Sequence, residues 1–216
     1  MATKNVATEF TKASVHPVTL TSGVHDPTED AINSPRHVEC VDCHNPHATR
    51  NATATVPAAP GSLNAVRGVN SGGAVIQMLQ NEYELCFRCH GDSGNRGPAR
   101  VTRQFVETNT RQEFNPANTS FHPVVAAGRN ASVPSLLPPW TTAGLTYCGD
   151  CHNNNQGPGA GAGNTGPKGP HGSVYTPILE RQLLLTDLTA YSQDNFALCF
   201  KCHSSAVVVS EQSSSW

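Results

Sequence analysis

Residues 40–47 read CVDCHNPH, and their first five residues form the pattern Cys-x-x-Cys-His. The same pattern recurs three times further along the chain. The four copies are Cys40–His44, Cys86–His90, Cys148–His152 and Cys199–His203. Together they contain all 8 cysteines of this 216-residue chain. These four motifs are therefore the main sequence evidence for the fold and chemistry of the protein.

Cys-x-x-Cys-His is the attachment signature of a c-type haem. In each copy the two thiols would form thioethers with the porphyrin, and the next histidine would be the proximal iron ligand. The predicted haem-attaching residues are Cys40, Cys43, Cys86, Cys89, Cys148, Cys151, Cys199 and Cys202. The predicted proximal ligands are His44, His90, His152 and His203. The sequence thus predicts four covalently bound haems c.

Other chemistries also use Cys-x-x-Cys. Paired motifs can build a zinc site, a single motif can be a thiol redox centre, and an even number of cysteines can form disulfides. None of these requires a histidine directly after the second cysteine. With 10 His in 216 residues, four such matches by composition alone have a probability on the order of one in 10⁵. We therefore favour haem attachment over zinc and disulfides.

The composition limits the protein's own hydrophobic core. Apolar residues make up 37% and aromatic residues 6% of the chain, which also contains 18 Gly and 16 Pro. Ordinary globular domains have a larger apolar fraction, and Gly and Pro interrupt helices and strands. We expect a mostly irregular, loop-rich fold with short α-helices, in which the haems of a tetrahaem cytochrome form the core.

The charge and hydropathy of the chain restrict the kinds of partner that it can bind and the cellular locations to be expected. The net charge is -2, from 14 basic and 16 acidic residues, which argues against nucleic-acid binding. Only four residues are lysines, too few for a lysine-rich docking face. No apolar run reaches the length of a transmembrane helix, and no signal-peptide core is visible. Because haem c is attached outside the cytoplasm, we expect an exported mature form, extracellular or at the cell surface, with the periplasm as the alternative.

The two halves of the chain repeat the same motifs in the same order. Each half contains His-Pro-Val, then Cys-x-Asp-Cys-His, then Pro-His, then Leu-Cys-Phe-(Arg/Lys)-Cys-His. Duplication is the simplest explanation. It predicts two di-haem modules, residues 1–107 and residues 108–216.

Six histidines remain after the proximal ligands are assigned. Four occupy matched positions in the two halves, and the chain has only two methionines. We therefore expect every iron to have two histidine ligands. The distal candidates are His16, matched with His122, and His47, matched with His171. His25 and His37 have no counterparts, so surface or second-shell roles are expected for them, such as a hydrogen bond from His37 to a haem propionate.

Local patterns predict a few regular elements. Asn81 is placed to cap a helix over 82–89, and 194–202 repeats that arrangement. The spacing of apolar residues in 177–190 predicts an amphipathic helix. The valine-rich tail 206–210 is expected to be a short strand, which an edge-to-edge contact could pair with another chain.

The order of these motifs resembles the doubled Cys-x-x-Cys-His family of multihaem cytochromes, over nearly the whole chain. The resemblance implies export, little regular structure and closely packed bis-histidine haems. Some tetrahaem and hexahaem relatives polymerise into extracellular filaments, in which one haem takes its distal histidine from the adjacent subunit. By analogy, His16 is the candidate for such a donation. In the second half Pro-His lies at His171, well after His152, and so departs from the spacing of the first half.

These features predict electron transfer rather than catalysis. Irons with six ligands leave no open position for a substrate, so we do not expect an enzyme. The favoured function is that of a subunit in an extracellular conducting filament, a homopolymer that delivers electrons to redox partner proteins or extracellular acceptors. The alternative is a monomeric periplasmic or cell-surface shuttle. A multihaem reductase is the least expected function.

Overall fold

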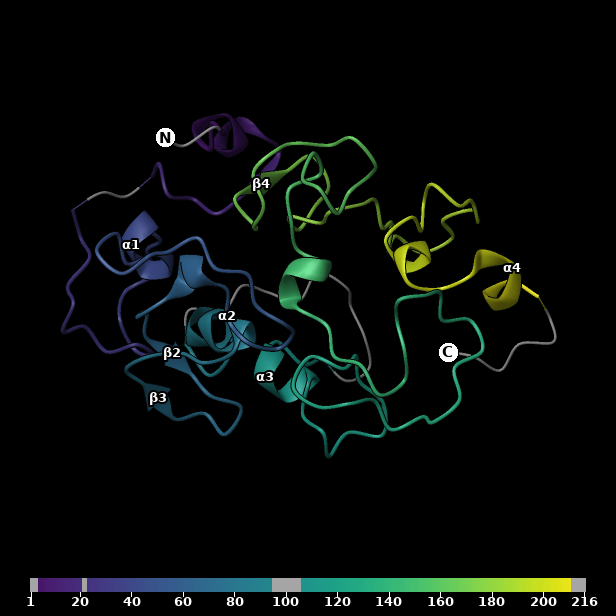
Figure 1. Cartoon of the computed structure of the whole chain (residues 1–216), viewed down its shortest axis with the longest axis horizontal. Coiled ribbons are helices and arrows are strands. Elements are labelled where there is room, and N and C mark those ends of the chain that lie inside the picture. Colours follow the sequence, from purple (N-terminus) through teal and green to yellow (C-terminus); the bar gives the residue numbers. More distant parts are fainter. Residues whose placement is uncertain (1–3, 21–22, 95–105, 211–216) are drawn as a thin grey trace. The chain divides into compact units, whose positions relative to one another are not determined.

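The structure is a computed structural model, which describes residues 4–20, 23–94 and 106–210. Loops and turns make up most of these residues, with short helices and two small sheets between them (Figure 1). The expected loop-rich fold with short α-helices is confirmed. The elements outside the Cys-x-x-Cys-His motifs are the 3₁₀ turns η1 (Ala7–Thr11) and η2 (Gly61–Leu63), strands β1 (Ser14–Val15), β2 (Gly68–Val69), β3 (Val75–Ile76) and β4 (Gly172–Ser173), and helices α3 (Thr110–Glu113) and α4 (Ser205–Val208).

Every Cys-x-x-Cys-His motif contains helical backbone. In a helical turn, residues three apart lie on the same side. The two cysteines of such a motif therefore project to one side, with the histidine directly after them. The four elements are α1 (Cys40–Cys43), the end of α2 (Glu82–His90), η3 (Cys148–Asp150) and η4 (Cys199–Lys201).

Helix α2 is the longest helix that the described residues form, and it begins where the sequence predicts. Asn81 precedes it, and the carboxylate of Glu84 accepts a hydrogen bond from the Asn81 backbone N–H at 2.8 Å. This capping box satisfies amide groups that the first turn of a helix leaves unpaired. Helix α2 packs against β2 through Phe87 and Val69, both fully buried in a cluster that also includes Val124.

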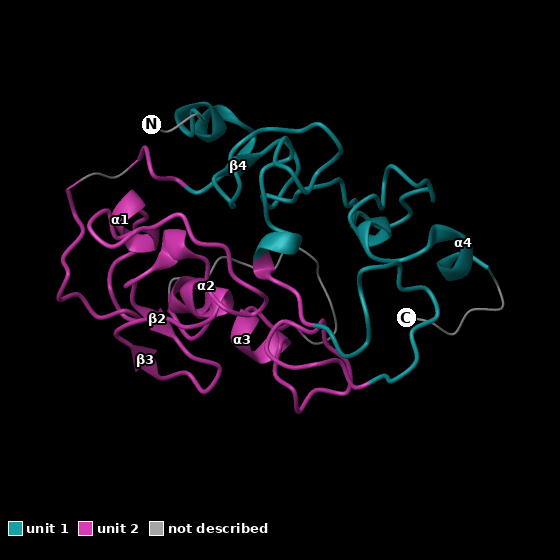
Figure 2. Cartoon of the chain, viewed as in Figure 1, with its two compact units in different colours: residues 1–16, 130–144, 149–216 teal, residues 17–129, 145–148 magenta. Residues whose placement is uncertain are grey.

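The chain divides into two compact units (Figure 2). Unit 2 consists of residues 17–129 and 145–148, and unit 1 of residues 1–16, 130–144 and 149–216. Within unit 1, β1 pairs with β4 in an antiparallel sheet, with Ser14 opposite Ser173. Within unit 2, β2 pairs with β3 in the same sense. The di-haem modules expected at 1–107 and 108–216 are defined by haem attachment and stay a prediction.

The hydrophobic core of the described residues is small. Eleven apolar side chains are buried, against twelve polar or charged ones. Only three of the apolar ones belong to unit 1: Ile178, Leu179 and Val208. Because apolar burial is the main favourable term in folding, a chain with so few buried apolar side chains requires another source of stability.

Three local expectations were wrong. Residues 177–190 form turns rather than an amphipathic helix, because Ile178 and Leu188 have φ angles of 55° and 63°, which a right-handed helix excludes. Residues 194–198 form turns, so that only η4 (Cys199–Lys201) of the expected 194–202 helix is helical. The valine-rich tail forms helix α4 (Ser205–Val208) instead of a strand.

Within the described residues, no helix combines the length and the apolar character that crossing a membrane requires.

Candidate haem-attachment sites and the clasps between them

The eight cysteines are all free thiols. Among the described residues, which include every cysteine, no group of three or more ligand atoms that contains a cysteine is close enough to hold a metal ion. A structural zinc site needs four such ligands around one point. The described residues thus contain no cysteine-bearing group of the kind that a structural zinc site requires.

The pKa values of two thiols, one in each half, do not fit a redox dithiol. Burial raises the pKa of Cys43 to about 12 and that of Cys202 to about 11. Reactive cysteines have a lowered pKa, because the thiolate is the nucleophile. Neutral, half-buried thiols such as these are poor centres for thiol–disulfide exchange.

Thiols from successive motifs are neighbours within each unit. The pairs are Cys43 with Cys89 and Cys86 with Cys148 in unit 2, and Cys151 with Cys202 in unit 1. The boundary between the units falls inside the third motif, between residues 148 and 149. Within each unit, successive Cys-x-x-Cys-His motifs are therefore adjacent.

Three of the four predicted proximal histidines are oriented through the same ring atom. Nδ1 of His44 donates to the Ser62 carbonyl at 3.0 Å, and Nδ1 of His152 donates to the Pro177 carbonyl at 3.0 Å. Nδ1 of His203 hydrogen-bonds with Ser135 Oγ at 2.9 Å. Metal-bound histidines commonly use one ring nitrogen for such a bond and the other for the metal. This geometry fits iron ligation through Nε2.

The distal candidate His16 has the same arrangement. Strand β1 carries it into unit 1, where its Nδ1 donates to the Pro170 carbonyl at 2.8 Å. Burial lowers the pKa of His16, against the effect of this hydrogen bond. Desolvation likewise lowers the pKa of His152, and the proximity of His16 lowers it further. Both rings therefore favour the neutral form that a metal ligand requires.

The remaining predicted axial ligands have other surroundings. The His171 ring meets Phe10 edge-on in unit 1, with ring centroids 6.1 Å apart. The predicted ligands His47, His90 and His122 are exposed. Among the predicted axial ligands, the structure thus brings His16 and His152 close together.

In each half of the chain, a basic side chain of the later Cys-x-x-Cys-His motif contacts the earlier motif. In unit 2, Arg88 lies between Cys86 and Cys89, and its Nη1 donates to the Asp42 carbonyl of the first motif at 3.0 Å. Its Nη2 pairs with Asp42 Oδ1 at 3.2 Å and with Glu29 Oε1. We call this group, Arg88 with Asp42 and Glu29, the Arg88 clasp.

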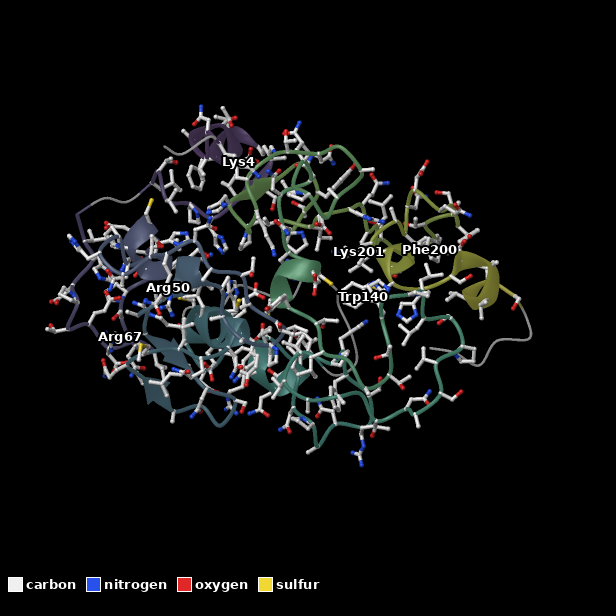
Figure 3. The ribbon with its side chains drawn as sticks, viewed as in Figure 1. Lys4, Arg50, Arg67, Trp140, Phe200 and Lys201 are labelled. Atoms are coloured by element: carbon white, nitrogen blue, oxygen red, sulfur yellow. The ribbon has the colours of Figure 1, made fainter. Side chains whose placement is uncertain are left out.

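Unit 1 contains an equivalent contact at the equivalent positions. Lys201, labelled in Figure 3, takes the place of Arg88 in the fourth motif. Its Nζ donates to the Asp150 carbonyl of the third motif and pairs with the carboxylate of Glu180, which is 1% exposed. We call this group the Lys201 clasp. The two clasps are structural counterparts of the sequence repeat.

Two histidines extend the Arg88 clasp. His25 Nδ1 lies 3.0 Å from Asp42 Oδ1, and His37 Nε2 lies 3.2 Å from Glu29 Oε2. Surface or second-shell roles were predicted for both histidines from the sequence, and this cluster was not. A partial signal was present: the repeat places an acidic residue in one motif and a basic residue in the other, in both halves.

No family model, curated protein or solved structure matches this chain.

Proposed function

We propose that this protein transfers electrons through four covalently attached haems c, each with two histidine ligands, as a subunit of an extracellular conducting filament. The observation that carries the proposal is the four Cys-x-x-Cys-His motifs, each with helical backbone and with thiols of successive motifs adjacent. The hydrogen bonds to Nδ1 of His44, His152 and His203 support it further. So does the scarcity of buried apolar side chains, since covalently held macrocycles would supply the missing core.

The cofactor supplies a one-electron iron couple. The chain's task is to hold each attachment site, set its spacing from the next and fix the ligand histidines. The clasps serve spacing, because each links the two motifs of one half through a charged side chain. The carbonyl bonds to Nδ1 serve orientation and raise ligand basicity. Bis-histidine ligation favours a lower reduction potential than histidine–methionine ligation.

His16 connects the proposal to assembly. It belongs to a segment, residues 1–16, that completes unit 1 through β1 and β4, whereas the residues after it belong to unit 2. Exchange of such a segment between identical chains is a low-cost route to oligomers. In a filament, the segment of one subunit would pair with β4 of its neighbour and deliver His16 there. The closed alternative, a monomeric shuttle, keeps β1 and β4 in one chain, as in this structure.

The test combines spectroscopy with electron microscopy on full-length protein matured with haem. We expect four haems per chain in the pyridine haemochrome assay, a low-spin EPR spectrum and filaments in negative stain. His16→Ala should remove the filaments and leave one iron with altered ligation, while Asp187→Asn, at an exposed position of the same unit, should change neither. Discrete particles with intact haems would favour the shuttle. A chain that attaches no haem would refute electron transfer by this route, and a high-spin iron in the native protein would favour an enzyme.

A further inference from the structure

Four ligand-type side chains of unit 2 converge beside the first motif. The atoms that they offer lie within 4.8 Å of one another, and we call the group the His/carboxylate cluster: His25, Glu29, His37 and Asp42. The first three belong to the loop that leads into α1, and Asp42 lies inside α1. None of the roles proposed above for attachment or axial ligation uses them.

The spacing of these atoms matches one metal centre. His25 Nδ1 lies 3.0 Å from Asp42 Oδ1 and 3.9 Å from Glu29 Oε1. His37 Nε2 lies 3.2 Å from Glu29 Oε2 and 3.8 Å from Asp42 Oδ1. Ligands at 2.0–2.1 Å from a tetrahedral zinc ion are about 3.3 Å apart. The observed separations bracket that value.

The tautomer of His37 gives independent support for a cation. Its Nδ1 donates to the Pro35 carbonyl at 2.8 Å, so the lone pair of the neutral ring is on Nε2. That side chain is only 10% exposed, and Nε2 is a buried atom with no hydrogen-bond partner, although Glu29 is near. A lone pair directed at carboxylate oxygens is repulsive unless a positive charge lies between them. The second-shell carbonyl is the usual support of a ligating histidine.

We propose that the His/carboxylate cluster binds a divalent transition-metal ion of the zinc class. Two imidazoles and two carboxylates suit zinc, whereas calcium and magnesium prefer oxygen ligands alone. Arg88 contacts both carboxylates and acts as a second-shell partner. Ligation through His25 Nδ1 requires the tautomer that carries its proton on Nε2, so that the ion takes the position between Nδ1 and Asp42 that a shared proton would occupy.

The experiment measures zinc uptake by the purified full chain after treatment with a chelator. Isothermal titration with zinc chloride and elemental analysis should give one zinc ion per chain. His37→Ala should weaken binding by at least about 100-fold, above the effect of losing a second-shell partner. Asp187→Asn, which removes an exposed carboxylate of unit 1, should leave the affinity unchanged. Circular dichroism and haem content verify that each variant folds.

A spectroscopic measurement on unmutated protein avoids any folding defect. Zinc-edge X-ray absorption should show nitrogen and oxygen ligands at about 2.0–2.1 Å, including two imidazoles. Sulfur at about 2.3 Å would place zinc on the motif thiols and overturn the proposal. Failure of the unmutated chain to take up zinc, or unchanged affinity in His37→Ala, would do the same. Because haem content is measured separately, loss of zinc binding leaves the electron-transfer proposal untouched.

Discussion

The Arg88 clasp and the Lys201 clasp join equivalent motifs with different side chains. Both basic residues donate to the backbone carbonyl of an aspartate in the preceding motif. Arg88 also holds two carboxylates, which in addition face His25 and His37. Lys201 holds one carboxylate, and no other ion pair to Glu180 is found in the described part of the chain. The backbone bond between motifs is thus shared by the halves, while the surrounding charges differ.

This difference shows what the repeat requires. A basic side chain that reaches the preceding motif is common to both halves, so we infer that it positions the two Cys-x-x-Cys-His motifs of each half relative to one another. The guanidinium of arginine presents a planar fork of donors, which can satisfy two carboxylates, whereas the lysine ammonium is a point charge. The first half uses the additional donors to organise a cluster, and the second half buries a single ion pair.

Lys201→Ala should have the largest effect on stability. It leaves Glu180, whose side chain is fully buried, without its cation, and breaking a buried pair in this way costs about 3–5 kcal/mol. Denaturant titration of the purified protein would measure the loss. Adding Glu180→Gln should recover part of it, since the orphaned charge is then removed. Equal stability of Lys201→Ala and of Asp187→Asn, an exposed position in the same unit, would show that the Lys201 clasp contributes nothing.

Arg88→Lys converts the first clasp into the geometry of the second. One ammonium cannot replace both guanidinium contacts, so we expect a loss of about 1.5–3 kcal/mol, the contribution of a hydrogen bond to a charged group. The reciprocal Lys201→Arg should not raise the stability, because Glu180 is the one carboxylate that pairs with this position in the described residues. The same titration measures both. A tolerated Arg88→Lys would mean that one contact suffices in either half.

Ser135→Ala tests ligand orientation in the second half against the first. It removes the side-chain hydrogen bond of His203, while Ser62→Ala retains the backbone carbonyl that holds His44. Loss of the hydrogen bond to Nδ1 makes His203 a less basic ligand, so the reduction potential of one haem should rise. We expect a rise of about 40 mV, equivalent to about 1 kcal/mol for one electron. Spectroelectrochemistry would detect this shift. An equal shift in Ser62→Ala would show that the serines act by other means.

The smallest expected changes in stability concern the residues at the start of α2 and before η4. Glu84→Ala removes the acceptor for the Asn81 and Gln80 amides and should cost about 1 kcal/mol. Asp194 aligns with Asn81 in the repeat, and Ala197 stands where the first half has Glu84; among the described contacts, the Asp194 carbonyl accepts a backbone hydrogen bond from Ala197 N–H and its carboxylate has none. Asp194→Ala should therefore change stability by less than about 0.5 kcal/mol. Thermal unfolding followed by circular dichroism distinguishes the two.

Local chemistry explains which features could be predicted. The loop-rich character follows from composition, and the start of α2 follows from Asn81 and Glu84, which are neighbours in sequence. The apolar spacing in 177–190 failed as a helix signal because Leu179 instead pairs with Tyr175 and with His152 of a distant segment. The His/carboxylate cluster escaped prediction for a similar reason. Arg88 meets Glu29 across 59 residues, and no local pattern records such a contact.

The pairing of β1 with β4 also has a consequence for the order in which the chain matures. Strand β1 is synthesised early, yet its partner begins at Gly172, more than 150 residues later. At a synthesis rate of about 5–20 residues per second, β4 follows β1 after on the order of 10–30 seconds. Residues 40–90, with the first two motifs, emerge within that interval. Unit 1 therefore cannot close until the chain is available as far as β4, after both motifs of the first half.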